Sequence, residues 1–252
     1  MKEKSSVNWG PEIEEQFERQ ASWTLFFRNQ IYRKINLTNA KNILEIGCGM
    51  GTITKELRAQ TSAKITAIDI DGKMIEVAKQ RVDDVEFLVE NVENLPLKDN
   101  KFDVILFQYL LLWVKNPIKA MNEIYRVCKK QGYVVALAEP DYGGWIEYPE
   151  MNLGTKHIEY LRDEGADPLA GRKILSYFET AGLETEISVI AQTWNKESLD
   201  NNIEEEWKRV LDANLITETE FKHIIEKEKT LIEQNRRMIF IPVFTAIGKK
   251  TK

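Results

Sequence analysis

Three glycines, Gly47, Gly49 and Gly51, occupy alternate positions directly after a short apolar stretch and directly before a helical pattern. Glycine has no Cβ, so it permits a sharp turn and allows a ligand to approach the backbone closely. Asp69 stands eighteen residues after Gly51, at the end of the next expected strand. A carboxylate there can accept hydrogen bonds from both hydroxyls of a ribose. The combination predicts a site for a ligand that contains a nucleoside.

The spacing of the glycines separates two classes of nucleoside ligand. A dinucleotide fingerprint reads G-x-G-x-x-G. After Gly49 this chain reads Met50, Gly51, Thr52, so the third glycine comes one position early. The spacing therefore disfavours a nicotinamide-dependent dehydrogenase.

Two segments carry a family resemblance. The segment ILEIGCGMG (43–51) resembles the E/D-x-G-x-G-x-G loop of class I S-adenosylmethionine-dependent methyltransferases. The segment ENVENLPLKDNKFDVI (90–105) resembles the D-A-x-x-L-P-F…F-D-x-V signature of the same family. The resemblance implies S-adenosylmethionine as cofactor, S-adenosylhomocysteine as product, and a Rossmann-like fold.

The resemblance also implies roles for individual residues. Glu45 would orient the methionine end of the cofactor, and Asp69 would bind the ribose. Ile70 would lie against the adenine face with Met74 nearby. Asn91 replaces the family's aspartate, and its amide oxygen can accept the same hydrogen bond from the adenine amino group. The cofactor-binding residues expected in this way are Arg19, Glu45, Gly47, Cys48, Gly49, Gly51, Asp69, Ile70, Met74, Asn91, Val92, Glu93, Phe107 and Gln108.

Strand and helix patterns alternate along residues 42–139. Strands are expected over 42–46, 64–69, 85–89, 102–108 and 133–139, and helices over 52–60 and 72–82 and from Pro117. Asp71 is expected to cap the second helix. Such alternation predicts a mostly parallel sheet with helices on both faces, and the resemblance implies seven strands of which the last is antiparallel.

The last hundred residues are less regular. We expect a helix over 168–183, a strand over about 184–194, and a helix with Leu199, Ile203, Trp207 and Leu211 on one face. A second helix begins with a possible capping box from Thr217 to Glu220. A strand over 238–248 closes the chain, with Pro242 near an edge or a bulge. One domain is expected over 1–252, with a helical lid (1–40), a cofactor-binding core (41–140) and a substrate-side region (141–252).

The methyl acceptor is expected to meet the segment AEPDYGGWIEYPE (138–150), where Trp145 and Tyr148 can line a pocket or simply cover the sheet edge. Methyl transfer needs mainly alignment, so an obvious catalytic dyad is not required. Asp141, Tyr142 and His157 are the catalytic candidates. The segment 18–28 resembles a lid in which Arg19 binds the cofactor carboxylate, and it equally suits an ordinary packed helix.

Composition limits the partners. The net charge is −5, which gives no basic footprint for duplex nucleic acid. The two cysteines fit a reducing compartment, and the cytoplasm is expected. The N-terminus lacks the apolar core of a secretory signal, and the apolar run 104–114 is too short to span a bilayer. No metal is expected.

The sequence thus predicts an enzyme that transfers a methyl group from S-adenosylmethionine to a small molecule, slightly favouring a planar or apolar acceptor. A nucleic-acid (tRNA) methyltransferase is one alternative, although the N/D-P-P-Y/F motif of enzymes that methylate base amino groups is replaced here by residues 107–110, FQYL. A non-catalytic S-adenosylmethionine-binding protein is another. The acceptor, any general base and the oligomeric state are left open.

Overall fold

The structure, a computed structural model, describes residues 11–252, and of residues 11–17 and 20 only the backbone. It divides into two compact units. Unit 1 holds the chain up to Gln108 together with Lys119–Leu137 and Gly248–Lys252; unit 2 holds Tyr109–Ile118 and Ala138–Ile247. The expectation that the N-terminus is not a secretory signal falls on residues 1–10, which lie outside the described residues.

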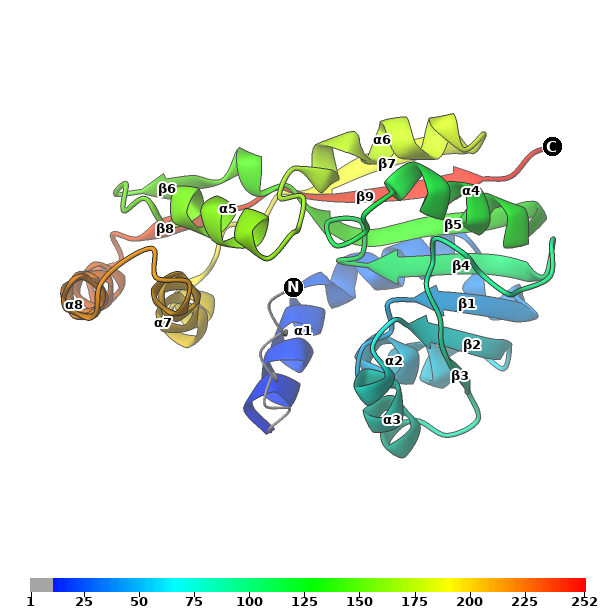
Figure 1. Cartoon of the computed structure of the whole chain (residues 1–252), viewed down its shortest axis with the longest axis horizontal. Coiled ribbons are helices and arrows are strands. Elements are labelled where there is room, and N and C mark those ends of the chain that lie inside the picture. Colours follow the sequence, from blue (N-terminus) through cyan, green and yellow to red (C-terminus); the bar gives the residue numbers. More distant parts are fainter. Residues whose placement is uncertain (1–10) are drawn as a thin grey trace. The chain divides into compact units, whose positions relative to one another are not determined.

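A seven-stranded sheet has the order β3-β2-β1-β4-β5-β9-β7 and is mostly parallel, with one antiparallel strand (Figure 1). The predicted α/β fold is confirmed. The register of β1 sets Ile46 beside Ile68 on β2 and beside Phe107 on β4. The strands are β1 (Asn42–Ile46), β2 (Lys64–Asp69), β3 (Glu86–Val89), β4 (Phe102–Gln108), β5 (Cys128–Pro140), β7 (Glu184–Ile190) and β9 (Val243–Lys249).

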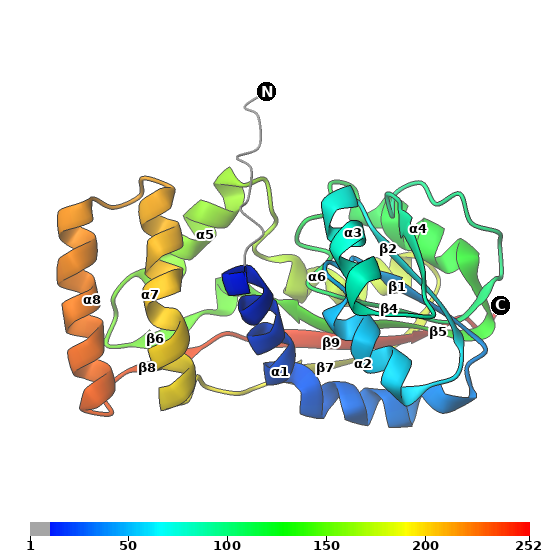
Figure 2. The ribbon, with the colours of Figure 1, turned by 90° about the horizontal axis from the view of Figure 1, so that it is seen from below.

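The crossovers between these strands determine on which face of the sheet each helix of unit 1 lies. The helices α2 (Thr52–Gln60) and α3 (Gly72–Arg81) connect strands in the direction from β1 to β3, whereas α4 (Pro117–Val127) connects β4 to β5 in the other direction. Right-handed crossovers in opposite directions place their helices on opposite faces of a sheet. Asp71 caps α3 as predicted, since its side chain accepts a hydrogen bond from Lys73 N. The long helix α1 (Pro11–Lys34) packs against α2 (Figure 2).

Unit 2 departs from the sequence prediction in several places. The expected strand 238–248 is two strands, β8 (Met238–Phe240) and β9, because Pro242 has no N–H for a ladder. A short strand β6 (Ile146–Tyr148) pairs antiparallel with β8, and a helix α5 (Leu153–Asp163) follows; neither was predicted. The remaining helices are α6 (Ala170–Thr180), α7 (Lys196–Asp212) and α8 (Glu218–Glu233), with a short 3₁₀ turn at Tyr142–Gly144.

The pair α7 and α8 forms the second core. Leu199, Ile203 and Trp207 are buried as predicted, but the next buried position is Val210, while Leu211 is only half-buried. Steps of four residues drift around a helix with 3.6 residues per turn, so the fourth member leaves the buried stripe. The predicted capping box from Thr217 to Glu220 is confirmed.

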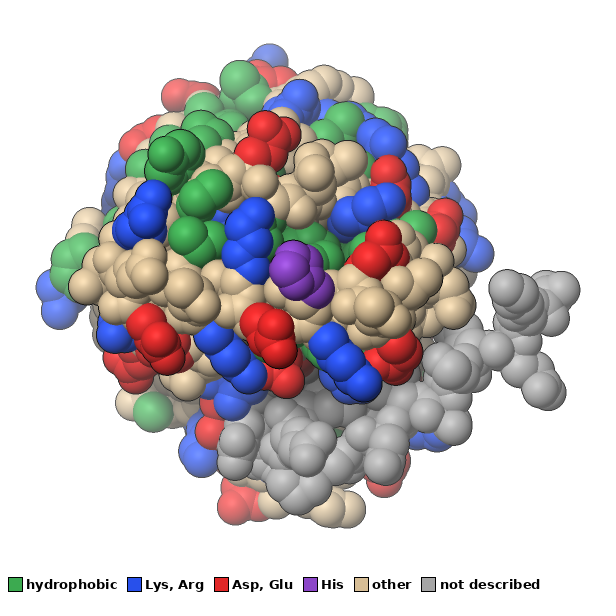
Figure 3. Space-filling view, turned by 90° about the vertical axis from the view of Figure 1, so that its left-hand side faces the viewer, with side chains coloured by type: hydrophobic (Ala, Val, Ile, Leu, Met, Phe, Trp, Pro, Cys, Tyr) green, Lys and Arg blue, Asp and Glu red, His purple; other side chains and the backbone are tan. Residues whose placement is uncertain are grey.

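The face seen in Figure 3 carries lysine, arginine and acidic side chains intermingled.

Among the described residues, no helix is both long and apolar enough to cross a membrane.

Candidate functional site

The glycine loop between β1 and α2 has the backbone that only glycine adopts readily. Gly47, Gly49 and Gly51 have φ values of 71°, 51° and 82°. The N–H groups of Gly47 and Cys48 both donate to Ile68 O, at 2.8 and 3.0 Å, which ties the loop to the end of β2. The Sγ atom of Cys48 lies in the core, and burial raises the pKa of this thiol.

Asp69 connects the end of β2 to this loop. Its Oδ2 accepts a hydrogen bond from Gly49 N at 2.9 Å, and its Oδ1 accepts one from Asp71 N at 2.9 Å. An ionised carboxylate has about four lone-pair positions. Two lone-pair positions of Asp69 are therefore free to accept further hydrogen bonds, and the half-buried side chain is accessible to a ligand that donates them.

Glu45, at the end of β1, is a buried carboxyl group with one unsatisfied oxygen. Its side chain is 3% exposed, and Oε2 has no hydrogen-bond partner. Burial raises the pKa of Glu45 to about 8; Thr54 acts in the opposite sense, Glu56 and Asp69 add to the rise, and Arg28 opposes it. A donor or cation brought to this point would satisfy the free oxygen.

The cation that acts on Glu45, Arg28, is already paired with another carboxylate. Arg28 of α1 is 1% exposed and donates from Nε and Nη2 to the two oxygens of Glu56 on α2, at 3.1 and 2.5 Å. Its Nη1 donates to Ala21 O at 2.6 Å and to Thr24 Oγ1, and reaches Gln108 Oε1 at 3.4 Å. Arg28 thus joins α1, α2 and the end of β4, and Gln108 lies in this network. Arg19, half-buried, lies on the same helix.

The predicted adenine side presents exposed apolar surface. Ile70 is 70% exposed and Val89, next to Asp69 across the β2–β3 ladder, is 52% exposed. Met74 is buried in α3. A flat apolar ring placed on Ile70 would cover surface that is otherwise costly to leave in water.

Asn91 shapes the turn that follows β3. Its Oδ1 accepts a hydrogen bond from Glu93 N at 2.9 Å, so this oxygen is already used once in the protein. An amide oxygen has a second lone pair for a ligand. Val92 is buried and Glu93 half-buried, and Phe107 on β4 is 1% exposed, so its side chain belongs to the core.

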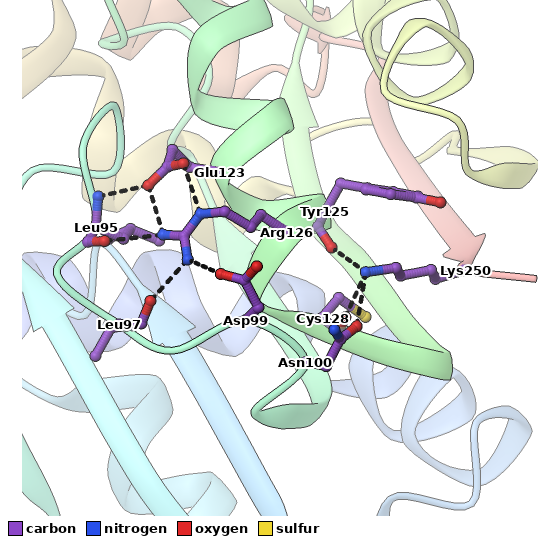
Figure 4. Close-up of polar contacts among 9 residues, drawn as sticks. All are labelled: Leu95, Leu97, Asp99, Asn100, Glu123, Tyr125, Arg126, Cys128 and Lys250. Carbon is purple, nitrogen blue, oxygen red and sulfur yellow. Dashed lines mark hydrogen bonds and ion pairs between the residues drawn. The ribbon is translucent and has the colours of Figure 1, made fainter. Parts of the chain in front are cut away.

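The segment after this turn is braced by α4 (Figure 4). Arg126 donates to Leu95 O at 2.9 Å, to Leu97 O at 2.7 Å and to Asp99 Oδ1 at 2.5 Å. Glu123 accepts two hydrogen bonds from Arg126 and one from Leu95 N at 2.8 Å. One guanidinium group therefore fixes residues 95–99.

Figure 4 also shows Lys250 at the end of α4. Its buried Nζ donates to Tyr125 O at 2.8 Å, Cys128 O at 2.9 Å and Asn100 Oδ1 at 3.0 Å. A lysine at this place satisfies carbonyl groups that have no partner within the helix.

The predicted catalytic residues lie in unit 2. Asp141 is 3% exposed; its Oδ1 accepts a hydrogen bond from Gly143 N at 3.0 Å, and its Oδ2 accepts one from Arg172 Nε at 2.6 Å. The carboxylate thereby caps the turn at Tyr142–Gly144. Both of its oxygens are engaged inside the protein.

Tyr142 and His157 are brought together. Their ring centroids lie 4.8 Å apart, and the ring of His157 also lies 5.8 Å from Trp145 and 5.7 Å from Tyr160. His157 is 3% exposed, and burial lowers its pKa, opposed by Glu206, whose Oε2 is 3.2 Å from Nδ1. A neutral histidine next to a carboxylate can accept a proton, as a general base must.

Several polar groups around these sites were not singled out from the sequence. In unit 1 they include Thr52, whose buried hydroxyl has no hydrogen-bond partner, and Glu56, which pairs with Arg28. Thr52 opens α2 directly after the glycines, which was the one available signal. The pairing of Arg28 with Glu56 had no signal in the sequence, because a helical pattern does not show which charged side chain is buried.

S-adenosylmethionine fits the residues of unit 1. The buried Glu45 Oε2 and Thr52 Oγ1 both have unmet hydrogen-bonding capacity at one edge of the sheet. The glycine loop leaves the backbone accessible at Gly49, Asp69 retains acceptor capacity, and Ile70 offers apolar surface. In the described part of the chain, no group of three or more candidate side chains is placed to hold a metal ion.

Fold and site together define a class I, S-adenosylmethionine-dependent methyltransferase domain. Residues 44–136 match the model of a family described as "Methyltransferase domain". Residues 44–136 carry this domain, and the resemblance seen in the glycine loop is confirmed.

Two curated relatives and one solved structure illustrate the likeness. A demethylmenaquinone methyltransferase of Thermotoga maritima is 30% identical over 112 residues, which are 44% of this chain and 49% of the relative. A malonyl-[acyl-carrier protein] O-methyltransferase of Bacillus cytotoxicus is 36% identical over 110 residues, 42% of this chain and 38% of the relative. The matched part thus spans half or less of these relatives.

The solved structure is a phosphoethanolamine N-methyltransferase of Haemonchus contortus in complex with phosphomonomethylethanolamine and S-adenosylhomocysteine. Its TM-score is 0.56 at 16% identity, over 84% of this chain and 49% of that one. At this identity the likeness concerns the fold alone.

Proposed function

We propose that the chain transfers the methyl group of S-adenosylmethionine to a small-molecule acceptor. The observation that carries the proposal is the set of unmet polar atoms around the glycine loop, above all Oε2 of the buried Glu45. The bound cofactor supplies an electrophilic methyl group on a sulfonium. Asp69 would bind the ribose hydroxyls, Asn91 with the backbone of Val92 and Glu93 the adenine, and Glu45 the ammonium group.

The acceptor side of the proposal rests on unit 2. Tyr142, Trp145 and His157 form an aromatic cluster with a neutral histidine in it. Aromatic faces favour a planar or apolar acceptor. His157 is the candidate general base where the acceptor carries a proton to be removed. Asp141 is the weaker candidate, since Arg172 and Gly143 occupy its oxygens.

The names of the relatives support a small acceptor. One acts on demethylmenaquinone and one on a malonyl group carried by acyl carrier protein. The two buried free thiols, Cys48 and Cys128, support a reducing compartment, and the cytoplasm is part of the proposal.

The test is a calorimetric titration with S-adenosylmethionine, S-adenosylhomocysteine and NAD. Micromolar binding of both sulfur compounds, worth about −8 kcal/mol, with no binding of NAD supports the proposal. A panel of quinols, carboxylates, thiols and amines with methyl-labelled cofactor then seeks the acceptor. Binding of NAD alone would overturn the assignment of the glycine loop. Binding of the cofactor without transfer to any of the panel or to tRNA would favour a non-catalytic binding protein.

A further inference from the structure

The segment that follows β4 has an unusual backbone. Tyr109, the first residue of unit 2, has φ = 53°. Large side chains seldom adopt this left-handed region, and a residue persists there only where its surroundings hold it. Conformations of this kind concentrate at functional sites.

A buried carboxyl group holds the two residues that follow. Glu139 on β5 is 0% exposed; its Oε1 accepts a hydrogen bond from Leu110 N at 2.8 Å and its Oε2 accepts one from Leu111 N at 3.0 Å. Burial raises the pKa of Glu139 to about 8, and these two hydrogen bonds act in the opposite sense. Two adjacent N–H groups pointing in one direction need two acceptor atoms on one side chain, which a carboxyl group supplies.

Both ends of the segment 109–112 are also hydrogen-bonded to other parts of unit 2. Tyr109 N donates to Ala138 O at 2.8 Å, next to Glu139 in the chain, and Leu112 O accepts a hydrogen bond from Asp167 N at 2.7 Å. Residues 109–112 are therefore fixed at four points by β5 and the segment before α6.

The segment before α6 that binds Leu112 O through Asp167 also holds Tyr142, since Tyr142 N donates a hydrogen bond to Pro168 O at 2.9 Å. Burial raises the pKa of Tyr142, and the nearby phenol of Tyr109 raises it further, followed by Glu206. The ring of Tyr142 lies 4.8 Å from that of His157, centroid to centroid. The segment 109–112 and Tyr142 are therefore both bound to residues 167–168, on the side of unit 2 where the acceptor is proposed to bind.

We propose that Glu139 is a positioning residue for methyl transfer: by binding Leu110 N and Leu111 N it holds Tyr109 in its left-handed conformation and so places the Tyr109 side chain beside Tyr142 on the acceptor side. The inference rests on the proposed function. It adds two residues to the site, Glu139 and Tyr109, and gives each a different role.

The first test compares Glu139→Gln with Glu228→Gln. Both carboxyl groups are 0% exposed and lie in unit 2, but Glu228 binds Trp207 Nε1 and Arg237 instead. Glutamine offers a single acceptor oxygen and turns an N–H₂ group toward the second backbone donor. Hydrogen exchange of the amides in 109–112 should rise at least about tenfold in Glu139→Gln, as expected for one lost hydrogen bond, and should stay unchanged in Glu228→Gln.

The second test asks whether the held segment serves the reaction. Glu139→Gln should lower kcat for an acceptor by about tenfold or more while the affinity for S-adenosylmethionine changes less than about threefold, because the cofactor is bound by residues of unit 1. Tyr109→Phe keeps the ring and the backbone and should lower kcat with the same unchanged affinity. In Tyr109→Gly, the glycine adopts a positive φ without strain, so the kcat of this variant measures the effect of losing the side chain even if Glu139→Gln fails to fold.

Unchanged exchange at 109–112 in folded Glu139→Gln overturns the proposal. Faster exchange with unchanged kcat, or unchanged kcat in both Tyr109 variants, overturns the link to methyl transfer. Failure of the wild-type protein to bind S-adenosylmethionine overturns the proposed function instead, and the exchange experiment distinguishes the two because it needs no ligand.

Discussion

Arg28 and Glu56 form a two-pronged ion pair between α1 and α2, with Nε to Oε1 at 3.1 Å and Nη2 to Oε2 at 2.5 Å. The arginine side chain is 1% exposed and the glutamate side chain 15%. Planar guanidinium and carboxylate groups fit one another in this arrangement, so the pair fixes geometry as well as charge. The helix in which the sequence indicated a lid is therefore anchored at Arg28.

Replacing Arg28 should destabilise the fold. Arg28→Ala leaves Glu56 and the carbonyl of Ala21 without their donor in a buried setting, at a cost of about 3 kcal/mol. Lys79→Ala, which breaks an exposed pair with Glu76, should cost about 0.5 kcal/mol or less. Urea unfolding followed by circular dichroism measures both. Equal losses in the two variants would show that the Arg28 pair carries no special weight.

Replacing Asp69 should weaken cofactor binding more than it weakens the fold. Asp69→Ala removes the expected ribose acceptor and the hydrogen bond to Gly49 N, and S-adenosylmethionine affinity should fall at least about tenfold. Asp84→Ala removes an exposed carboxylate of the same unit and should leave affinity unchanged. Calorimetry gives the affinities and thermal melting checks the fold. Wild-type affinity in folded Asp69→Ala would refute the ribose role.

Glu45 should make stability depend on pH. Its pKa rises from an ordinary 4.5 to about 8 in the folded chain, so the folded state binds a proton that the unfolded state has lost between those values. The stabilisation is complete below pH about 4.5 and is lost as the pH rises to about 8, at roughly 1.4 kcal/mol per pKa unit. Glu45→Gln should flatten the urea-unfolding free energy over this range. If the unfolding free energy of Glu45→Gln falls as steeply with pH as that of the wild type, the expectation is wrong.

The same proton should leave when the cofactor binds. An ammonium group beside Glu45 favours the ionised carboxylate, so the group releases its proton to the buffer. Calorimetry at pH 7 in two buffers of different ionisation enthalpy should report close to one proton released per S-adenosylmethionine. The thioether analogue without the amino-acid end, and the Glu45→Gln variant, should release none. Proton release that persists in Glu45→Gln would assign it to another group.

The bounds of several elements in unit 1 were predictable because their signals are local. The helix after the glycine loop and the strands at 64–69 and 102–108 begin and end where the sequence patterns place them. Each is a short apolar run bounded by glycine, a cap or a charged turn, so neighbouring residues suffice to define it. The number of strands in the main sheet and its one antiparallel strand followed from the family resemblance.

Unit 2 was less predictable because its elements depend on distant partners. The strand β6 has three residues and exists through its pairing with β8, ninety residues later in the chain. The sequence could place Asp141 at the end of a strand, but it could not show that Arg172 on α6 donates a hydrogen bond to its carboxylate. His157 was recognisable as a candidate, whereas its burial among aromatic rings requires the packing of several segments.

Arg126 should support cofactor binding from a distance. Arg126→Ala removes the donors to Leu95 O, Leu97 O and Asp99 and releases the segment that follows Asn91. Hydrogen exchange over 95–99 should rise, and affinity for S-adenosylmethionine should fall by about three- to tenfold, since the turn at Asn91–Glu93 is less well ordered before binding.

Two comparisons separate this effect from a general loss of stability. Arg126→Lys keeps the charge but not the fork of donors, so it should restore only part of the affinity. Lys129→Ala removes a basic side chain that is about as exposed as Arg126 and that pairs with Asp103 in β4, and it should leave both exchange over 95–99 and affinity unchanged. Adenosine should lose affinity in Arg126→Ala by the same factor as the whole cofactor, because the adenine end is the part affected. If adenosine binding is unchanged while S-adenosylmethionine binding falls, the brace acts elsewhere in the site.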